Sequence, residues 1–447
     1  MLIRRLNTGA AIALALTTVS AGCRPTDPLR QRPPVADTAL VGRDIRVLAA
    51  DSLEGRRTGT AGNDSAAAFI GRRLAALGLQ PVIPDTIACG GNGASRNCAM
   101  SHLQPFVARP AAAGHAAGVA SSLSTSNVVG LIRGTDPALR GQYVILGAHY
   151  DHLGRSTFGA LDPEKGEEIR NGADDNASGT AAVLELARLL AQQPPRRSVL
   201  VVLFSGEELG LLGSQHFVEH PPVPLDSVQA MLNFDMVGRL REDKLIVYGV
   251  ATAGELPDVV RSANLTPLLR ITAVGDGFGP SDHSSFFAKN IPVLHFFTDV
   301  HEHYHRASDE APTINVQGIT RVVTFAERIT RDLTDRPTRL TFVPAPVTAT
   351  AGSSRNSSQA WLGTIPDMAA GETTGLRITG VRAGSPADSG GLKAGDVIVE
   401  LGGKAVTDLY TYTDALYANQ PGDRVTIVFL RGAQRDTVRV TLGRRGG

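Results

Sequence analysis

Between residues 127 and 335, short apolar runs alternate with stretches of helical periodicity, and this alternation constrains the fold more than any other feature. The runs NVVGLI, YVILGA, SVLVVLFS, VQAMLNF, KLIVYGV and IPVLHFF are typical of strands. The stretches GTAAVLELARLLAQQ, LGLLGSQHFVEH and VQGITRVVTFAERITRDL have the spacing of helices with one apolar face. Strands interleaved with helices predict an α/β fold, in which a mostly parallel mixed sheet is covered by helices on both faces.

Chemically active side chains follow several of these predicted strands. They are histidines and carboxylates: His149 in VILGAHYDH, Asp174 in RNGADDNASG, Glu207 and Glu208 in VVLFSGEELG, Asp235 in MLNFDMVG, and His305 in HEHYHRASD. In open α/β sheets, functional groups collect beyond the carboxyl ends of the strands. We therefore expect these side chains to lie together at one edge of the sheet.

These residue types suit a centre that holds two zinc ions, because imidazole nitrogen and carboxylate oxygen both bind zinc. One carboxylate has to bridge the two ions, and Asp174 is predicted for that position. His149 and Asp235 are then expected to complete one ion, and Glu208 and His305 the other.

One carboxylate, Glu207, is left over for proton transfer. Glu207 precedes a predicted ligand and is expected to take a proton from water and pass it to the leaving amine. Asp151 follows His149 by two residues and is predicted to orient its imidazole. Each motif alone also has a purely structural explanation, such as a helix cap in GADDNASG. Only their joint occurrence predicts a hydrolytic metal centre.

The remaining histidines near these motifs receive weaker predictions. His301, His303 and His305 alternate, so an extended chain would place them on one face. A third metal is one interpretation, and solvated or substrate-lining histidines are the favoured one. His283 in SDHSSF is expected to line a pocket or to form a hydrogen bond, and His152 receives no role.

The five motifs resemble those of the di-zinc exopeptidase family that includes secreted bacterial leucine aminopeptidases and aminopeptidase Y. The resemblance extends over residues 40 to 335 and includes LEGRRTGTAGN and SDHSSF. It implies a metalloaminopeptidase that removes N-terminal residues from peptides with two zinc ions. It also implies that Tyr304 hydrogen-bonds the oxyanion and that the Asp174–Asp175 peptide bond is cis.

Two other functions stay open. The same metal chemistry suits a carboxypeptidase or a glutaminyl cyclase, because the sequence identifies no dedicated acidic residue for a substrate's free amine. The chain could also be a catalytically silent protein that binds peptides through its C-terminal module.

That module, residues 359–447, resembles a PDZ domain. The matching segments are WLGTIPD, SPADSGGLKAGDVI and the closing hairpin DRVTIVFLR–DTVRVTL. PDZ domains add the C-terminus of a partner as an extra strand. The resemblance places Leu362 and Gly363 in the carboxylate-binding loop and Thr364 and Ile365 on the accepting edge. The alternative is a small β-module that binds nothing.

The first 23 residues, MLIRRLNTGAAIALALTTVSAGC, have the layout of a secretory signal, and their apolar part is too short to span a membrane. Small residues before Cys23 resemble a bacterial lipobox, which implies lipidation of Cys23. We therefore expect a protein outside the cytoplasm, anchored by lipid and facing the periplasm. Ordinary cleavage nearby would instead give a soluble periplasmic or secreted protein.

The remaining segments complete the predicted organisation. Residues 24–40 read as a proline-rich tether, residues 41–335 as the peptidase domain and residues 336–358 as a linker. In an oxidising compartment Cys89 and Cys98 could close a loop as a disulfide. The formal net charge of +1 gives no reason to expect a nucleic acid partner, and we expect membrane contact only through a lipid anchor.

Overall fold

The computed structural model describes residues 34–90, 97–110, 122–157, 159–264, 269–344, 360–366, 374–381, 384–407 and 409–444. Cys23 and the predicted signal segment lie outside the described residues. Within those ranges, no helix is long and apolar enough to cross a bilayer.

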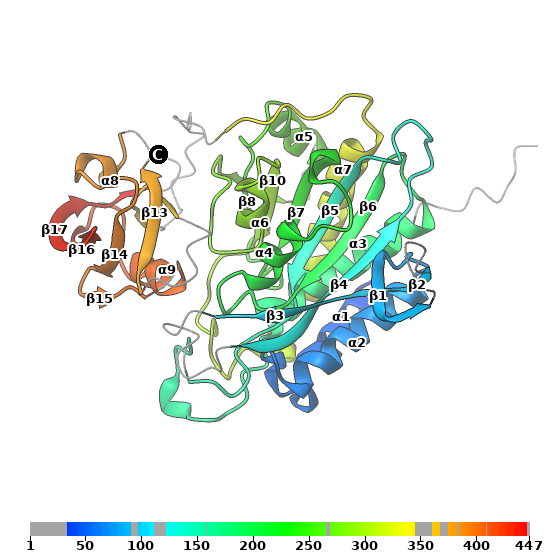
Figure 1. Cartoon of the computed structure of the whole chain (residues 1–447), viewed down its shortest axis with the longest axis horizontal. Coiled ribbons are helices and arrows are strands. Elements are labelled where there is room, and N and C mark those ends of the chain that lie inside the picture. Colours follow the sequence, from blue (N-terminus) through cyan, green and yellow to red (C-terminus); the bar gives the residue numbers. More distant parts are fainter. Residues whose placement is uncertain are drawn as a thin grey trace, which may run out of the picture. The chain divides into compact units, whose positions relative to one another are not determined.

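A mixed sheet forms the centre of the large domain, with the strand order β3-β4-β6-β5-β7-β10-β8-β9 (Figure 1). Its strands are β3 (Leu103–Ala108), β4 (Leu123–Ile132), β5 (Tyr143–His149), β6 (Ser198–Phe204), β7 (Val228–Phe234), β8 (Lys244–Tyr248), β9 (Arg270–Ala273) and β10 (Val293–Phe297). The neighbouring strands β6, β5, β7 and β10 run parallel to one another. The pairs β3–β4, β4–β6 and β10–β8 are antiparallel. The mixed, largely parallel sheet predicted from the sequence is confirmed.

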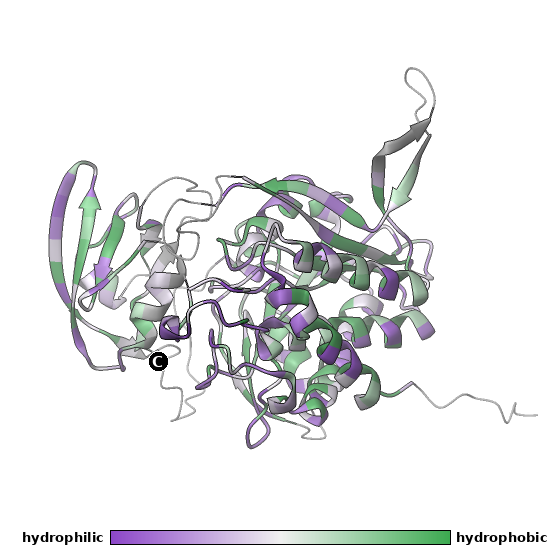
Figure 2. Cartoon of the chain, turned by 90° about the horizontal axis from the view of Figure 1, so that it is seen from below, coloured by the Kyte–Doolittle hydropathy of each residue, from purple (hydrophilic) through white to green (hydrophobic). Residues whose placement is uncertain are grey.

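Helices cover both faces of this sheet. Their bounds are α1 (Thr38–Leu48), α2 (Ala61–Ala76), α3 (Gly179–Gln192), α4 (Leu212–Glu219), α5 (Leu256–Ala263), α6 (His283–Phe287) and α7 (Val316–Asp335). Alternate residues of β5 point to opposite cores: Leu146 packs with α3 and α7, whereas Ile145 packs with α4 and α6. Helices that cover a sheet need one apolar and one polar face. Figure 2 shows this alternation along the helices of the domain.

The ends of the large domain differ from the prediction. Helix α1 begins at Thr38, inside the expected tether, and Asp37 caps it by accepting hydrogen bonds from two main-chain amides. At the other end, residues 336–344 belong to the domain and not to a linker. Phe342 forms a β-bridge with Ala253 and contacts the ring of Phe287, so the chain stays docked beyond α7.

The N-terminal region also shows how local chemistry sets an element. Thr60 caps helix α2 by accepting a hydrogen bond from the Asn63 amide. The preceding turn, η1 (Asp51–Arg56), contains left-handed backbone at residues 54–56. A β-hairpin, β1 (Ile83–Gly90) and β2 (Asn97–Ser101), follows α2 and pairs the backbone of Cys89 with that of Cys98. The cysteine side chains lie outside the description, so the disulfide stays a prediction.

The C-terminal module has a core of its own. Its sheet follows the order β12 (Thr364–Pro366), β13 (Leu376–Val381), β14 (Val397–Leu401), β16 (Arg424–Arg431) and β17 (Gln434–Thr441), with β15 (Lys404–Ala405) paired to β14. Strands β11 (Ala360–Trp361) and β18 (Gly443–Arg444) form a separate pair. Helices α8 (Pro386–Ser389) and α9 (Leu409–Tyr417) complete the module. The core residues, among them Ile398 and Ile427, come only from this segment.

Candidate metal centre

The predicted ligands gather beyond the carboxyl ends of neighbouring parallel strands. His149 is the last residue of β5, Glu207 and Glu208 follow β6, and Asp235 follows β7. His305 lies in the loop after β10. These elements converge because a run of parallel strands brings all its carboxyl ends to one edge of the sheet.

The carboxylate between the two histidines belongs to Asp175, and not to Asp174 as predicted. Asp175 Oδ1 lies 3.4 Å from His149 Nε2, and its Oδ2 lies 3.1 Å from His305 Nε2. The cis peptide is likewise one residue later than expected, between Asp175 and Asn176. Both residues come from η4 (Ala173–Ser178), the turn that leads into α3.

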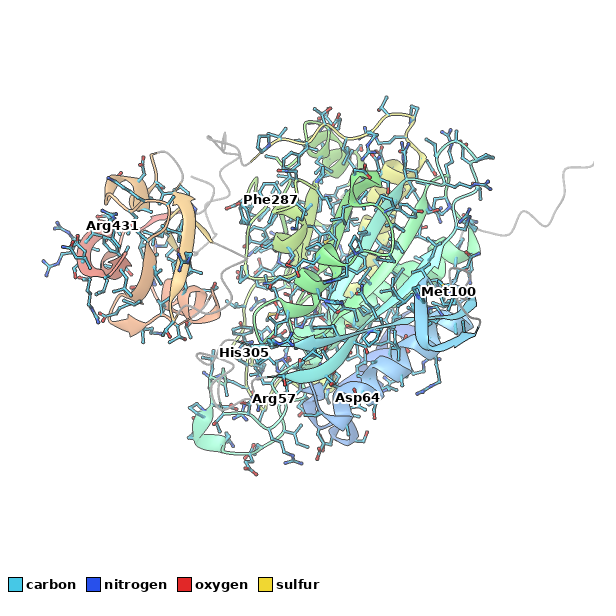
Figure 3. The ribbon with its side chains drawn as sticks, in the orientation of Figure 1. Arg57, Asp64, Met100, Phe287, His305 and Arg431 are labelled. Carbon is cyan, nitrogen blue, oxygen red and sulfur yellow. The ribbon has the colours of Figure 1, made fainter. Side chains whose placement is uncertain are left out.

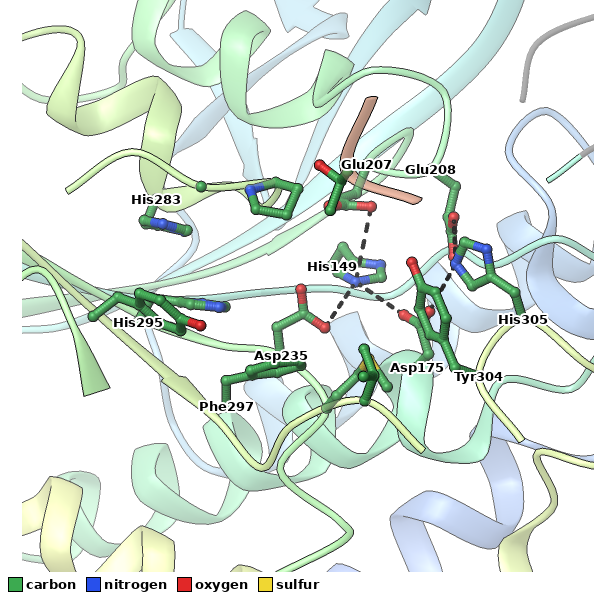
Figure 4. Close-up of a pocket in the computed structure, with 16 residues that line it drawn as sticks. His149, Asp175, Glu207, Glu208, Asp235, His283, His295, Phe297, Tyr304 and His305 are labelled. Carbon is green, nitrogen blue, oxygen red and sulfur yellow. Dashed lines mark ion pairs between the residues drawn. The ribbon is translucent and has the colours of Figure 1, made fainter. Parts of the chain in front are cut away.

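Each histidine has a second carboxylate at a similar distance. His149 Nε2 lies 3.4 Å from Asp235 Oδ1, and His305 Nε2 lies 3.3 Å from Glu208 Oε2 (Figure 4). Atoms bound to one tetrahedral zinc at about 2.1 Å are separated by about 3.4 Å. The four ligand-to-ligand distances therefore fit two zinc ions that share Asp175.

Two further residues lie close to this set at distances that suit other roles. His152 Nδ1 lies 2.8 Å from Glu208 Oε1, a hydrogen-bond length, and 3.8 Å from Asp175 Oδ2. His152 therefore orients Glu208, a role the sequence did not reveal. Glu207 Oε2 lies 4.0 Å from His149 Nε2, farther than either carboxylate that pairs with that imidazole.

Asp151 connects two ligand-bearing segments. Its main-chain oxygen lies 3.2 Å from His149 Nδ1, whereas its carboxylate lies 3.8 Å from that nitrogen. The carboxylate accepts hydrogen bonds from the Glu207 amide at 3.2 Å and from the Thr58 hydroxyl at 2.9 Å. Asp151 therefore contacts His149 mainly through its backbone and fixes the Glu207 segment through its side chain.

The buried acids give the site a strongly negative potential. Burial lowers the pKa of His149, but the charges of Glu207 and Asp235 outweigh burial and raise the pKa well above its ordinary value. Burial raises the pKa of Glu207 well above its ordinary value, and the neighbouring Glu208 charge adds to this effect. A site of this kind attracts cations, because opposite charges interact strongly where solvent is excluded.

Asp174 and His301 form a pair of their own beside the centre. Asp174 Oδ2 lies 3.0 Å from His301 Nε2, and its Oδ1 accepts a hydrogen bond from the Gly238 amide at 2.6 Å. Asp309, the last residue of the YHRASD motif, accepts hydrogen bonds from the amides of Asp174 and Asp175. Among the described residues, two groups of three could hold an ion: His149, Glu207 and Asp235, and His152, Asp175 and Glu208. Neither group includes His301 or His303.

A pocket opens beside the centre. Tyr304 lines it and stacks on His305, with ring centroids 3.8 Å apart. The wall away from His305 carries His283 and His295, whose rings are stacked at 4.3 Å (Figure 4). His283 therefore lines the pocket, as predicted. Apolar and aromatic side chains complete the lining: Met236, Tyr248, Phe297 and Val300.

Comparison with known proteins identifies both parts of the chain. Residues 127–329 match the model of peptidase family M28, and this segment carries every residue of the cluster. The chain contains an M28 peptidase domain. Residues 354–442 match the PDZ domain model, so the C-terminal module is a PDZ domain.

The M28 domain is similar in sequence to curated peptidases and in structure to several solved proteins. Aminopeptidase YwaD of Bacillus subtilis is 33% identical over 159 residues, which are 32% of this chain and 34% of YwaD. The chain spans about a third of the length of the first curated relatives it matches. A leucine aminopeptidase precursor from Bacteroides thetaiotaomicron has a similar structure, with a TM-score of 0.53 and 17% identity, covering 67% of this chain and 99% of that chain. A glutaminyl cyclase of the same species bound to N-acetylhistamine gives a TM-score of 0.52 and 17% identity, with the same coverage. These structural likenesses establish the fold.

The predicted peptide-binding residues occupy one edge of the PDZ domain. Strand β12, which contains Thr364, pairs with β13, and no other described strand pairs with it. Gly363 has a left-handed backbone with φ of 83°, and a Cβ there would lie 2.3 Å from Ser385 Cβ. Leu362 is buried, and Thr364 Oγ1 lies 2.7 Å from the hydroxyl of Tyr412 on α9. The side chain of Ile365 lies outside the description.

Proposed function

We propose that the M28 domain is a di-zinc aminopeptidase that removes N-terminal residues from peptides. One observation carries the proposal: the carboxylate of Asp175 lies between two imidazoles, each of which has a further carboxylate at ligand distance. His149, Asp235 and Asp175 would hold one ion, and His305, Glu208 and Asp175 the other. Zinc, when bound, supplies Lewis acidity toward the scissile carbonyl and lowers the pKa of water.

Glu207 supplies the proton transfer. Its carboxylate lies next to the ligands without sharing their short distances, and its raised pKa suits a group that takes a proton and gives it back. Glu207 accepts a proton from the attacking water and returns it to the leaving amine. Tyr304 lines the same pocket and is the proposed hydrogen-bond donor to the oxyanion.

The pocket also suggests which part of the substrate lies where. Glu207, the pocket carboxylate not assigned to an ion, would favour the protonated α-amine of a peptide, because opposite charges attract strongly in a poorly solvated site. The wall formed by Met236, Tyr248, Phe297 and Val300 is apolar. We infer that this wall takes the side chain of the N-terminal residue, so that large apolar residues are cleaved best.

A substrate panel tests the proposal. The full chain is assayed with aminoacyl-p-nitroanilides, N-blocked dipeptides and peptides that begin with glutamine, each with and without a chelator. Hydrolysis of the free-amine substrates alone, lost with chelator and restored by zinc, is the expected result. Cleavage of N-blocked dipeptides would indicate a carboxypeptidase, and ring closure of N-terminal glutamine would indicate a cyclase. Folded protein that binds no zinc would support the silent binding protein.

Two further parts of the proposal concern location and partners. We infer an extracytoplasmic protein anchored through Cys23, and labelling cells with a palmitate analogue would detect this lipid in the wild type and not in Cys23→Ser. For the PDZ domain we propose binding of protein C-termini along β12. A library of C-terminal peptides tested on the full chain would reveal a ligand, and no binder at all would favour a packing role.

A further inference from the structure

The turn at residues 54–58, within the motif LEGRRTGTAGN, lies next to the metal centre and has an unusual backbone. Glu54, Gly55 and Arg56 have φ angles of 46°, 66° and 53°. Left-handed backbone is costly for residues other than glycine, so Glu54 and Arg56, on either side of Gly55, keep it only where their surroundings impose it. A Cβ on Gly55 would lie 2.2 Å from the main-chain oxygen of Arg170, which shows how closely the turn approaches the neighbouring loop.

Arg56 is completely buried and binds main-chain oxygens of three separate segments. It donates to Leu48 at the end of α1, to Tyr150 at 2.7 Å, and to Asn171 and Gly172 at 2.6 Å and 3.1 Å. Tyr150 lies between His149 and Asp151, whereas Gly172 lies three residues before Asp175. One guanidinium therefore ties the segment of the first imidazole to that of the shared carboxylate.

The charge of Arg56 also acts on the site. Burial lowers the pKa of Arg56 to about 10, so the group stays protonated at neutral pH. The carboxylates of Asp151, Asp175 and Glu208 are close enough to oppose that shift. No described carboxylate forms an ion pair with Arg56, whose hydrogen bonds go to main-chain oxygens. In Figure 3 the neighbouring Arg57 is labelled in the same lower part of the domain as His305.

Thr58 extends this support to the proton carrier. Its hydroxyl donates to Asp151 Oδ2 at 2.9 Å, and Asp151 Oδ1 accepts from the Glu207 amide at 3.2 Å. All three residues are buried. The chain of contacts thus runs from the turn to the backbone of Glu207.

We propose that Arg56 and Thr58 are positioning residues of the metal centre. Arg56 holds the segments of His149 and Asp175 at the separation that a shared ligand requires, and Thr58 fixes Asp151 and through it Glu207. The inference rests on the proposed function for the ligand assignments. It gives two buried residues of the LEGRRTGTAGN motif a role in positioning the centre.

A pair of substitutions at Thr58 tests the proposal in the full chain. Thr58→Val removes the hydroxyl at nearly constant volume, and Thr58→Ser keeps it. Losing a hydrogen bond that supports ligand residues lowers metal affinity or activity by about 10- to 100-fold. For Thr58→Val we expect kcat on leucine-p-nitroanilide to fall about 10-fold at a similar KM, and bound zinc to pass to a chelator at least several times faster. Thr58→Ser should restore both values.

Thr330→Val is the matched control. Thr330 is equally buried, but its hydroxyl donates to the Ala326 oxygen within α7. Its removal should lower the unfolding temperature without changing kcat or zinc release. Identical zinc release and kcat in Thr58→Val and the control would overturn the proposal. Zinc release is measured without substrate. A wild type that cleaves no peptide would therefore refute the proposed function, whereas the comparison of zinc release would still test the positioning role.

Arg56→Lys extends the test. Lysine has three donors on one nitrogen and cannot reproduce the planar fork of a guanidinium. Faster zinc release than in Thr58→Val is expected, and release as slow as in the wild type would contradict the role of Arg56. If Arg56→Lys does not fold, the comparison of Thr58→Val with Thr58→Ser still tests the proposal.

Discussion

The carboxylate of Asp151 accepts a hydrogen bond from the main-chain amide of Glu207 at 3.2 Å, which joins the strand end of β5 to that of β6. Asp151 is fully buried and its other oxygen is bound by Thr58. In Asp151→Asn one of these two donors would face an amide nitrogen. We expect kcat to fall about 10- to 100-fold while zinc content stays at the wild-type value. Steady-state kinetics with metal analysis checks this, and an unchanged kcat would show that the connection is dispensable.

The neighbours Asp174 and Asp175 should differ sharply when each is changed to asparagine. Asp175 faces both imidazoles, so Asp175→Asn is expected to lose most bound zinc and nearly all activity. Asp174→Asn keeps an oxygen for the Gly238 amide and removes the charge beside His301, so it should keep both ions and lose only part of the activity. Metal analysis of the two proteins after dialysis decides the assignment. Zinc loss in Asp174→Asn alone would restore the original prediction.

Patterns that repeat along the chain predicted the fold well. Continuous apolar runs identified β4 to β7 and β10, and helical spacing identified α3 and α7, because burial on both faces or on one face imposes these patterns directly. The ligand motifs also fell at strand ends, where they were expected. The choice between Asp174 and Asp175 failed because adjacent residues in an irregular turn share every feature of sequence context. Only the backbone path through η4 determines which carboxylate faces the histidines.

The supporting residues were harder to predict for a related reason. Arg56 binds main-chain oxygens, which every residue carries. The identities of its partner residues therefore give no signal in the sequence. His152 looked like any other histidine until the fold placed it beside Glu208. Asp309 did have a signal, because it follows His305 by four residues in HEHYHRASD.

His305 should depend on the loop that precedes Asp175. Its backbone is left-handed, with φ of 54°, and its Nδ1 lies 2.9 Å from the Gly159 oxygen. Asp162 holds that loop by accepting from the Ala307 amide and by pairing with the buried Arg170 at 2.7 Å. Breaking a buried ion pair from one side costs about 3–5 kcal/mol.

Asp162→Asn is therefore expected to lower the unfolding temperature and to weaken zinc retention. Chelator competition and thermal unfolding measure the two effects. Glu168→Gln, which alters an exposed ion pair with Lys165 in the same loop, is the control and should change neither. Equal zinc retention in Asp162→Asn and Glu168→Gln would show that the loop does not support the metal centre.

The PDZ domain should show its own dependence on pH. Burial raises the pKa of Asp396, but hydrogen bonds from Arg431 and the Lys393 amide outweigh burial, so the net pKa lies below its ordinary value. A depressed carboxyl pKa stabilises the fold above the pKa of the unfolded chain, about 3.9, and this contribution is lost as pH falls through the folded pKa. Asp396→Asn should thus cost about 1–3 kcal/mol at neutral pH and progressively less below about pH 4.

The fluorescence of Trp361, the single tryptophan of the chain, reports unfolding of this domain during urea titration. Glu400→Gln is the comparison, because Glu400 pairs with an exposed Arg435 at 3.9 Å and should contribute little. A cost for Asp396→Asn that does not change with pH would contradict the role of its charge.

The most direct test of the proposed mechanism is made on Glu207→Gln. Zinc stoichiometry and turnover are determined on one preparation of this variant. Glu207 lies beside the ligand set without belonging to it, so glutamine should leave two zinc ions per chain. The neutral amide cannot take a proton from water, so turnover should fall by at least about 100-fold. Two retained ions with turnover abolished is the predicted result. Unchanged turnover, or loss of zinc together with activity, would contradict the assignment of Glu207 as the proton carrier.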